Sequence, residues 1–393
     1  MTQLKTVFVI TVLTSRMLMP GMPSLPAGMG MPEMGAPTKS MTMDLTSDKK
    51  VDASSTAQCA VPEGLKLGPK VDLEIDLPVK EKVAPVGGPA EGTKPAATKF
   101  VMKSYWDCSG TVLPGQPKVV DTDQMMKGMP AGGMMGGGKM RGMPSMRSMA
   151  AGDGKSHAYW PNSKDGKKIV KDSSSPGPYE LTTNYCGGTS ITFDKDQEFL
   201  AGIDITNPGK GALDLEKAIK IEWKSVPLAQ AYIITAFAGK KGEMVMWTSS
   251  SKPDVTVDWM GTAFTKAEIA GYITKGILLP ATATSCSIPA GIFKDMGAPM
   301  ITMTALGVDK MQEKNGIQTN VIVRSTGMLM AGRGFGGAMI EDSPATNQPE
   351  DTTTTDTTSS NNTTAPPAPP PASNTAADKA KDALHKLGGI FKH

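Results

Sequence analysis

The methionines of this chain are concentrated in two segments rich in Gly and Pro, where their side chains are close enough in sequence to share a metal ion. The pattern Met-x-Met-x-x-Met occurs twice in the first segment, and four methionines spaced three apart end the second. A thioether is a soft, neutral ligand that favours Cu(I) over Zn(II) or hard cations. The candidate ligands are Met17, Met19, Met22, Met29, Met31, Met34, Met140, Met143, Met146 and Met149.

The same segments have a second interpretation that needs no metal. Methionine is flexible and polarizable, so a chain of Met, Gly and Pro can act as an adaptable contact surface, a spacer or an oxidisable scavenger. The triplet Gly-Met-Pro recurs four times, as low-complexity sequence produces without any selection for metal binding. We therefore expect contact or spacing first and no cofactor, with a copper-binding or copper-sequestering role as the alternative.

Residues typical of enzymatic catalysis are few and scattered. Only three histidines occur, His157, His385 and His393, and the last two lie in the C-terminal tail. No nucleophile elbow, zinc-protease motif or P-loop is present. Asp254 and Asp258 are four residues apart, which says nothing about the carboxylate separation that a glycosidase needs. The sequence therefore predicts a protein that is not an enzyme.

The charge balance argues against one large class of partner. Lys and Arg contribute 41 positive charges against 38 negative charges from Asp and Glu, and no long basic run occurs. Nucleic-acid binding through phosphate neutralisation needs a dense positive surface. We expect a protein or cell-envelope partner and no nucleic acid.

The four cysteines, Cys59, Cys108, Cys186 and Cys286, are far apart and form no Cys-x-x-Cys motif. An even number in a secreted chain predicts two disulfides, for which three connectivities exist. The pairing Cys59–Cys108 with Cys186–Cys286 is preferred, because each bond then lies within one folded segment. Four free thiols in a cytosolic protein are the alternative.

The N-terminal residues 1–13 have two interpretations. Lys5 precedes a short apolar run, as in a secretory signal segment, but the run is at the lower length limit and no Ala-x-Ala cleavage site follows. The alternation of Val7, Val9, Thr11 and Leu13 instead fits an edge strand. Together with the cysteines and a Thr/Pro-rich tail, the segment favours a periplasmic or secreted protein. No apolar run approaches the roughly 20 residues of a membrane span.

The folded part is expected to be mainly β, with an antiparallel β-sandwich as its main domain and a smaller N-terminal β module. Val71, Leu73, Ile75 and Leu77 alternate with acidic residues, and seven short strand-like segments follow residue 156. One inserted helix is expected after Thr265, which forms a capping box with Glu268. The expected organisation is a Met/Gly/Pro-rich arm at 14–40, the β module at 41–122, a Met/Gly-rich linker at 123–155, the sandwich at 156–333, a disordered Thr/Pro linker at 334–376 and an amphipathic helix at 377–393.

The stretch "IEWKSVPLAQAYIITAFAG" resembles the second and third strands of a fibronectin type III or related immunoglobulin-like module, over about 100 residues in all. The resemblance implies that Trp223, in a Trp-x-x-x-Pro phrase ending at Pro227, packs under Tyr232 of the next strand. The phrase "YWDCSGTVLPGQP" resembles secreted proteins of Gram-negative bacteria that have no assigned activity, which implies an envelope location.

The last segment, 377–393, places Ala, Leu and Phe on one helical face and Lys beside it. Such a helix could contact an anionic membrane surface or a partner groove, or be a frayed terminus. The whole sequence thus predicts a non-enzymatic, extracytoplasmic binding or structural protein of the cell envelope.

Overall fold

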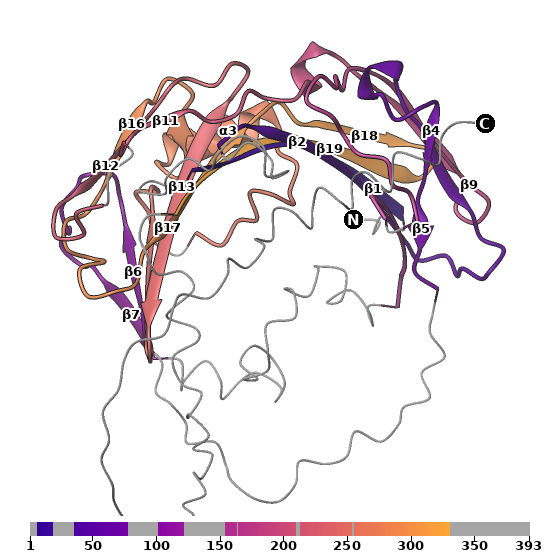
Figure 1. Ribbon diagram of the computed structural model, residues 1–393. Coiled ribbons are helices and arrows are strands. Elements are labelled where there is room, and N and C mark those ends of the chain that lie inside the picture. Colours follow the sequence, from indigo (N-terminus) through magenta and orange to yellow (C-terminus); the bar gives the residue numbers. More distant parts are fainter. Residues whose placement is uncertain are drawn as a thin grey trace, which may run out of the picture. The chain divides into compact units, whose positions relative to one another are not determined.

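Most of the described strands join one mixed, twelve-stranded sheet, called here the main sheet (Figure 1). The computed structural model describes residues 6–18, 35–77, 101–121, 154–162, 164–209, 213–253 and 255–330. The strand order is β5 (Glu74–Ile75), β8 (Ser156–Trp160), β2 (Thr38–Ser47), β1 (Thr6–Leu18), β19 (Ile317–Met330), β17 (Met300–Leu306), β13 (Ala231–Lys240), β14 (Glu243–Thr248), β6 (Val101–Trp106) and β7 (Lys118–Asp121). Two further strands pair with this path, β15 (Leu279–Pro280) with β13 and β18 (Lys310–Lys314) with β19.

Two smaller sheets share a hydrophobic core with the main sheet. The first has the order β10 (Gly188–Phe193), β9 (Gly177–Thr183), β3 (Ala57–Ala60) and β4 (Lys70–Asp72). The second has the order β11 (Ile205–Asn207), β12 (Ile219–Trp223) and β16 (Ser285–Ile288). The described helices are two 3-10 turns, η1 (Glu63–Leu65) and η2 (Lys195–Gln197), and the α-helix α3 (Lys266–Thr274). The predicted mainly β fold is confirmed.

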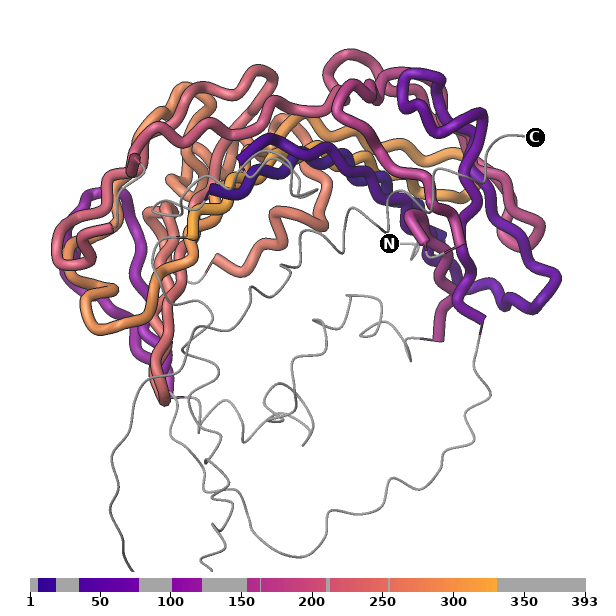
Figure 2. Tube along the Cα trace, viewed as in Figure 1, coloured from indigo at the N-terminus to yellow at the C-terminus, as the bar shows by residue number. Residues whose placement is uncertain are grey.

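Strand β1 lies in the interior of the main sheet. It pairs parallel with β19 on one side and antiparallel with β2 on the other, so that the two ends of the described chain run side by side (Figure 2). Phe8, Ile10 and Val12 are buried in the shared core, and the residues between them face the other way. The expected edge strand is therefore wrong in its position, because both sides of β1 are paired.

The predicted boundaries of the first arm, 14–40, are also wrong at both ends, since β1 continues to Leu18 and β2 begins at Thr38. Most of that arm, nearly all of the Met/Gly-rich linker, the Thr/Pro linker and the C-terminal segment lie outside the described residues. In the described part of the chain, no helix is long and apolar enough to cross a membrane.

The predicted division into a β module at 41–122 and a sandwich at 156–333 is wrong. Strands from both ranges are neighbours in the main sheet, as in the pairs β2–β8 and β14–β6. The alternating segment from Lys70 also divides, because β4 joins the four-stranded sheet and β5 joins the main sheet. Every pair between described strands of residues 156–330 is antiparallel, as predicted, and the parallel pairs involve β1 and β6.

Two local predictions are confirmed. The side chain of Thr265 accepts a hydrogen bond from the Glu268 amide at 3.1 Å, the Glu268 carboxylate accepts one from the Thr265 amide at 2.7 Å, and α3 follows. The rings of Trp223 and Tyr232 pack edge to face, with their centroids 5.5 Å apart. These residues come from β12 and β13, which lie in different sheets, so the contact helps to hold the two layers together.

Candidate functional site

One face of the main sheet carries a contiguous group of methionines and lies opposite the shared core. In β13, Tyr232, Ile234 and Ala236 are core residues, so the alternation of a strand directs Thr235 and Phe237 to the other side. The same alternation in the neighbouring strands brings seven methionines and two aromatic residues to that side. We call this set the methionine face: Met17, Met102, Met244, Met246, Met300, Met328, Met330, Trp106 and Phe237.

The strand register makes these side chains neighbours. Met17 is the Cα partner of Met328, Met330 is the partner of Met300, and Met300 is also the partner of Phe237. Phe237 is in turn the partner of Met246. Directly opposed side chains have Cβ atoms about 5 Å apart, so the face is continuous from β1 to β14.

The methionine face is exposed and nearly uncharged. Met17 is 45% exposed, Phe237 40% and Met246 42%, and the other members are half-buried. Beyond the part of the sheet that α3 covers, the other residues of β13, β14, β17 and β6 that face this side are Thr, Ser and Gly. A charged residue on this side of the next strand, β7, is Lys118, at the edge of the sheet. Contiguous exposed apolar surface of this kind marks interaction sites in soluble proteins.

The other end of the same sheet side is covered by the segment that contains α3. Ile269 of α3 packs with Phe264, Leu278 and the sheet residues Ile233 and Leu306 in a second, smaller hydrophobic cluster. This cluster ends before Thr235 along β13, which is where the methionine face begins.

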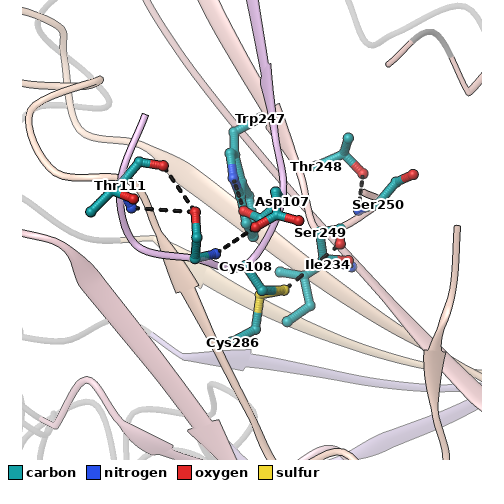
Figure 3. The surroundings of a disulfide bond; sticks show 10 residues. Asp107, Cys108, Thr111, Ile234, Trp247, Thr248, Ser249, Ser250 and Cys286 are labelled. Carbon is teal, nitrogen blue, oxygen red and sulfur yellow. Dashed lines mark hydrogen bonds between the residues drawn. A yellow bond between two sulfur atoms is a disulfide. The ribbon is translucent and has the colours of Figure 1, made fainter. Parts of the chain in front are cut away.

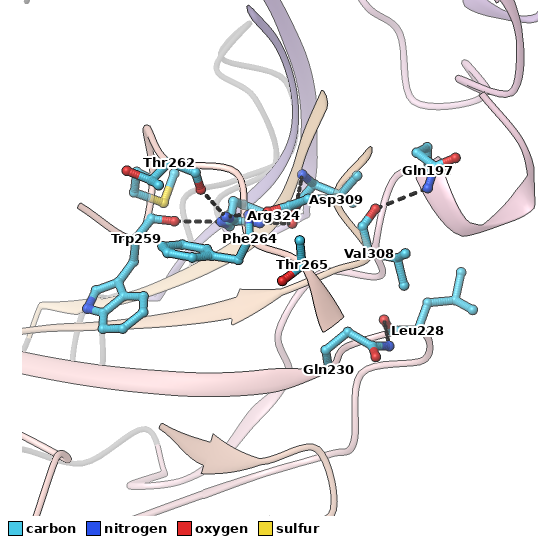
Figure 4. Close-up of polar contacts among 12 residues, drawn as sticks. Gln197, Leu228, Gln230, Trp259, Thr262, Phe264, Thr265, Val308, Asp309 and Arg324 are labelled. Carbon is cyan, nitrogen blue, oxygen red and sulfur yellow. Dashed lines mark hydrogen bonds and ion pairs between the residues drawn. The ribbon is translucent and has the colours of Figure 1, made fainter. Parts of the chain in front are cut away.

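A buried ion pair fastens this cover to the sheet (Figure 4). Arg324 of β19 and Asp309 are both fully buried, and two guanidinium nitrogens donate to the two carboxylate oxygens at 2.6 and 2.9 Å. The remaining Arg324 N–H groups donate to the carbonyl oxygens of Trp259, Thr262 and Val323 at 2.6 to 2.8 Å. Because all five N–H groups have an acceptor, the charge is fully compensated.

A disulfide joins the main sheet to the three-stranded sheet (Figure 3). Cys108, directly after β6, is bonded to Cys286 of β16, with Cα atoms 4.9 Å apart. The Ser287 amide donates to the Cys108 carbonyl at 3.3 Å, and the Trp247 indole donates to the Asp107 carbonyl at 3.0 Å. The end of β6 is thereby fixed against the facing layer.

The expected pairing Cys59–Cys108 with Cys186–Cys286 is wrong, and so is the alternative of four free thiols. Cys59 and Cys186 are free. Cys59 lies in β3 of the four-stranded sheet, whereas Cys108 follows β6 of the main sheet and is bonded to the three-stranded sheet. Burial raises the pKa of the Cys59 thiol to about 12, so this cysteine is unreactive in the folded chain.

The structure accounts for few of the site residues expected from the sequence. Of the ten candidate copper ligands, Met17 lies on the methionine face, and the other nine lie outside the described residues. His157 lies in β8, with Nδ1 3.4 Å from the Thr46 hydroxyl. Asp258 closes a local turn by accepting from the Met260 and Gly261 amides, and Asp254 is outside the described residues. Among the described side chains, no three His, Cys, Asp or Glu converge as a metal site.

Sequence reasoning missed six members of the methionine face, Met102, Met244, Met246, Met300, Met328 and Met330. A signal was present, because Met244 and Met246, like Met328 and Met330, are two residues apart within a strand and so share a side. Comparison of the chain with family models, curated proteins and solved structures finds no match.

Proposed function

We propose that the protein is a non-enzymatic, extracytoplasmic binding protein of the cell envelope, and that the methionine face is its contact surface. The observation that carries the proposal is the position of this face, outside both hydrophobic clusters yet continuous over five neighbouring strands. The flexible thioether side chains suit a surface that adapts to its partner. We therefore propose a protein partner that offers apolar side chains.

The disulfide supports the extracytoplasmic location. Disulfides form and persist in oxidising compartments and are rare in cytosolic proteins. If the chain is exported, processing must leave Thr6–Leu18 in place, because this strand pairs with both of its neighbours. Export with retention of β1 is therefore part of the proposal. Contact between residues 377–393 and a membrane surface also remains a proposal, since that segment lies outside the described residues.

The strand order supports the resemblance to immunoglobulin-like modules. From β11 to β19, three strands in the order β11-β12-β16 face four in the order β14-β13-β17-β19. Three strands facing four in two layers is the arrangement of many cell-surface domains. We infer that residues 205–330 form such a module, which carries most of the methionine face and is extended by β6 and by β1.

Site-specific photo-cross-linking in the intact source cells tests the contact surface. A benzophenone side chain replaces Phe237 on the methionine face, which is 40% exposed, or Val112 in the loop after the disulfide, which is 46% exposed. We expect a defined protein adduct from position 237 and none from position 112. Adding Met246→Glu should abolish the adduct, because Met246 is the cross-strand partner of Phe237. Equal cross-linking from both positions, or none from position 237, would refute the proposal.

A further inference from the structure

We propose that Met17, Met300, Met328 and Met330 form a binding site for a soft monovalent cation, which in the cell would be Cu(I). The site belongs to the methionine face, so this inference rests on the proposed function and names a ligand for part of that surface. It differs from the copper alternative considered for the sequence, because three of its four ligands lie in folded strands outside the Met/Gly/Pro segments.

The register of three adjacent strands brings these four thioethers together. Met17 of β1 is paired with Met328 of β19, and Met330 of β19 is paired with Met300 of β17. Paired residues on one face have Cβ atoms about 5 Å apart, and residues two apart in a strand about 7 Å. Two rotatable bonds set the position of each methionine sulfur, so the Met328 and Met330 thioethers can turn toward each other and toward their cross-strand partners Met17 and Met300. In the proposed site, the four sulfur atoms are directed to one ion above β19.

The surroundings favour a soft ion of low charge. Thr302 lies opposite Met328, and Thr326 precedes it on the same side of β19, so the neighbouring side chains are neutral. Among the described residues paired with these methionines, none has a carboxylate to compensate a divalent cation, whose burial costs far more than that of a monovalent one. Thioethers prefer Cu(I) to hard cations such as Mg²⁺ or Ca²⁺. The neutral four-sulfur set therefore selects for Cu(I) over the common divalent ions.

The same face contains a natural comparison group. Met102 is the cross-strand partner of Met244, and Met246 lies two residues further along β14. This arrangement offers three thioethers where the proposed site offers four. We expect it to bind more weakly, so that the first equivalent of metal occupies the four-methionine site.

The test uses the full chain with methionines labelled at the ε-methyl carbon, Ag(I) as a redox-inert probe, and Cys186→Ser to remove the half-buried thiol. At one equivalent of Ag(I), the methyl resonances of Met300, Met328 and Met330 should shift. Those of Met43 and Met303, which are fully buried on the core side, should not. Single Met→Leu variants assign the resonances, so this result does not depend on a multiple variant that has to fold.

The matched variants are M300L/M328L/M330L and M102L/M244L/M246L, compared by anaerobic competition for Cu(I) with a chromophoric chelator. Leu preserves the apolar volume, and thermal unfolding checks the fold of each variant. The first variant should weaken the first binding step at least about tenfold, and the second should leave it unchanged. Equal weakening by both variants, or a first equivalent that shifts only other methionines, would overturn the proposal. Neither result would affect the cross-link from position 237, so the two proposals can fail independently.

Discussion

Replacing Asp309 by Asn tests whether the buried ion pair holds the α3 segment against the main sheet. The Asp309 carboxylate accepts four hydrogen bonds, two from the Arg324 guanidinium and one each from the Phe264 and Val323 amides, both at 2.9 Å. Asn has a single acceptor oxygen, and its NH₂ group would face N–H donors. The variant therefore leaves a buried guanidinium charge without its counter-charge and a backbone amide without an acceptor.

The expected loss in the free energy of unfolding is about 3–5 kcal/mol, the usual cost of removing one partner of a buried pair. Urea denaturation of the full chain, monitored by tryptophan fluorescence, measures this loss of free energy. Urea is uncharged and therefore does not screen the ion pair. The Trp259 carbonyl accepts a hydrogen bond from Arg324 in the same network, so the emission of Trp259 should also report loosening of the cover.

The control is Asp214→Asn, which breaks the Lys217–Asp214 pair, where both side chains are largely exposed and 2.9 Å apart. Because exposed pairs are screened by solvent, this variant should unfold like the wild type within error. If Asp309→Asn loses no more stability than Asp214→Asn, the buried pair does not fasten the cover and this reasoning is refuted.

Two further predictions concern Glu198 and the free cysteines. Burial acts to raise the pKa of Glu198, but hydrogen bonds from Ser174, from the Phe199 amide and from Ser175 outweigh it and hold the pKa below its usual 4.5. The ionised Glu198 carboxylate therefore contributes its full stabilisation above about pH 4.5, and this contribution is lost as the pH falls through the lower folded-state pKa. Glu198→Gln should flatten the pH dependence of the urea midpoint in that acid range. An unchanged slope would contradict this prediction. Without reductant, thiol titration should find one reactive cysteine in the native chain, Cys186, and two after unfolding, because Cys59 is buried; four after unfolding would exclude the disulfide.

Features that depend on neighbouring residues in the sequence were predictable. The capping box before α3 needs two residues three apart, whereas the packing of Trp223 on Tyr232 was implied by the resemblance to immunoglobulin-like modules. The assembly of the main sheet was not predictable in this way. The pair β1–β19 joins Thr6 to Ile317, and no local pattern records which distant strand completes a sheet. The domain division failed for this reason, and the disulfide pairing failed with it.

The candidate site could not be predicted for the same reason, because local sequence does not record which distant strands pair. Composition draws attention to segments where methionine is dense, but each strand of the methionine face contributes only one or two. Their grouping depends on the register between β1, β19 and β17, since a shift of one residue would turn every side chain to the opposite side. Paired methionines two apart in a strand, as in "EMVM" and "MLM", were the available signal.

The contrast between the two ends of this sheet side strengthens the case for a ligand. At one end, the chain covers Ile233 and Leu306 with α3 and buries the charged pair of Arg324 and Asp309 to do so. At the other end, Phe237 remains 40% exposed although it continues the same strand and the same side. Exposed apolar surface costs free energy in water. The half that no described segment covers therefore gains most from a ligand.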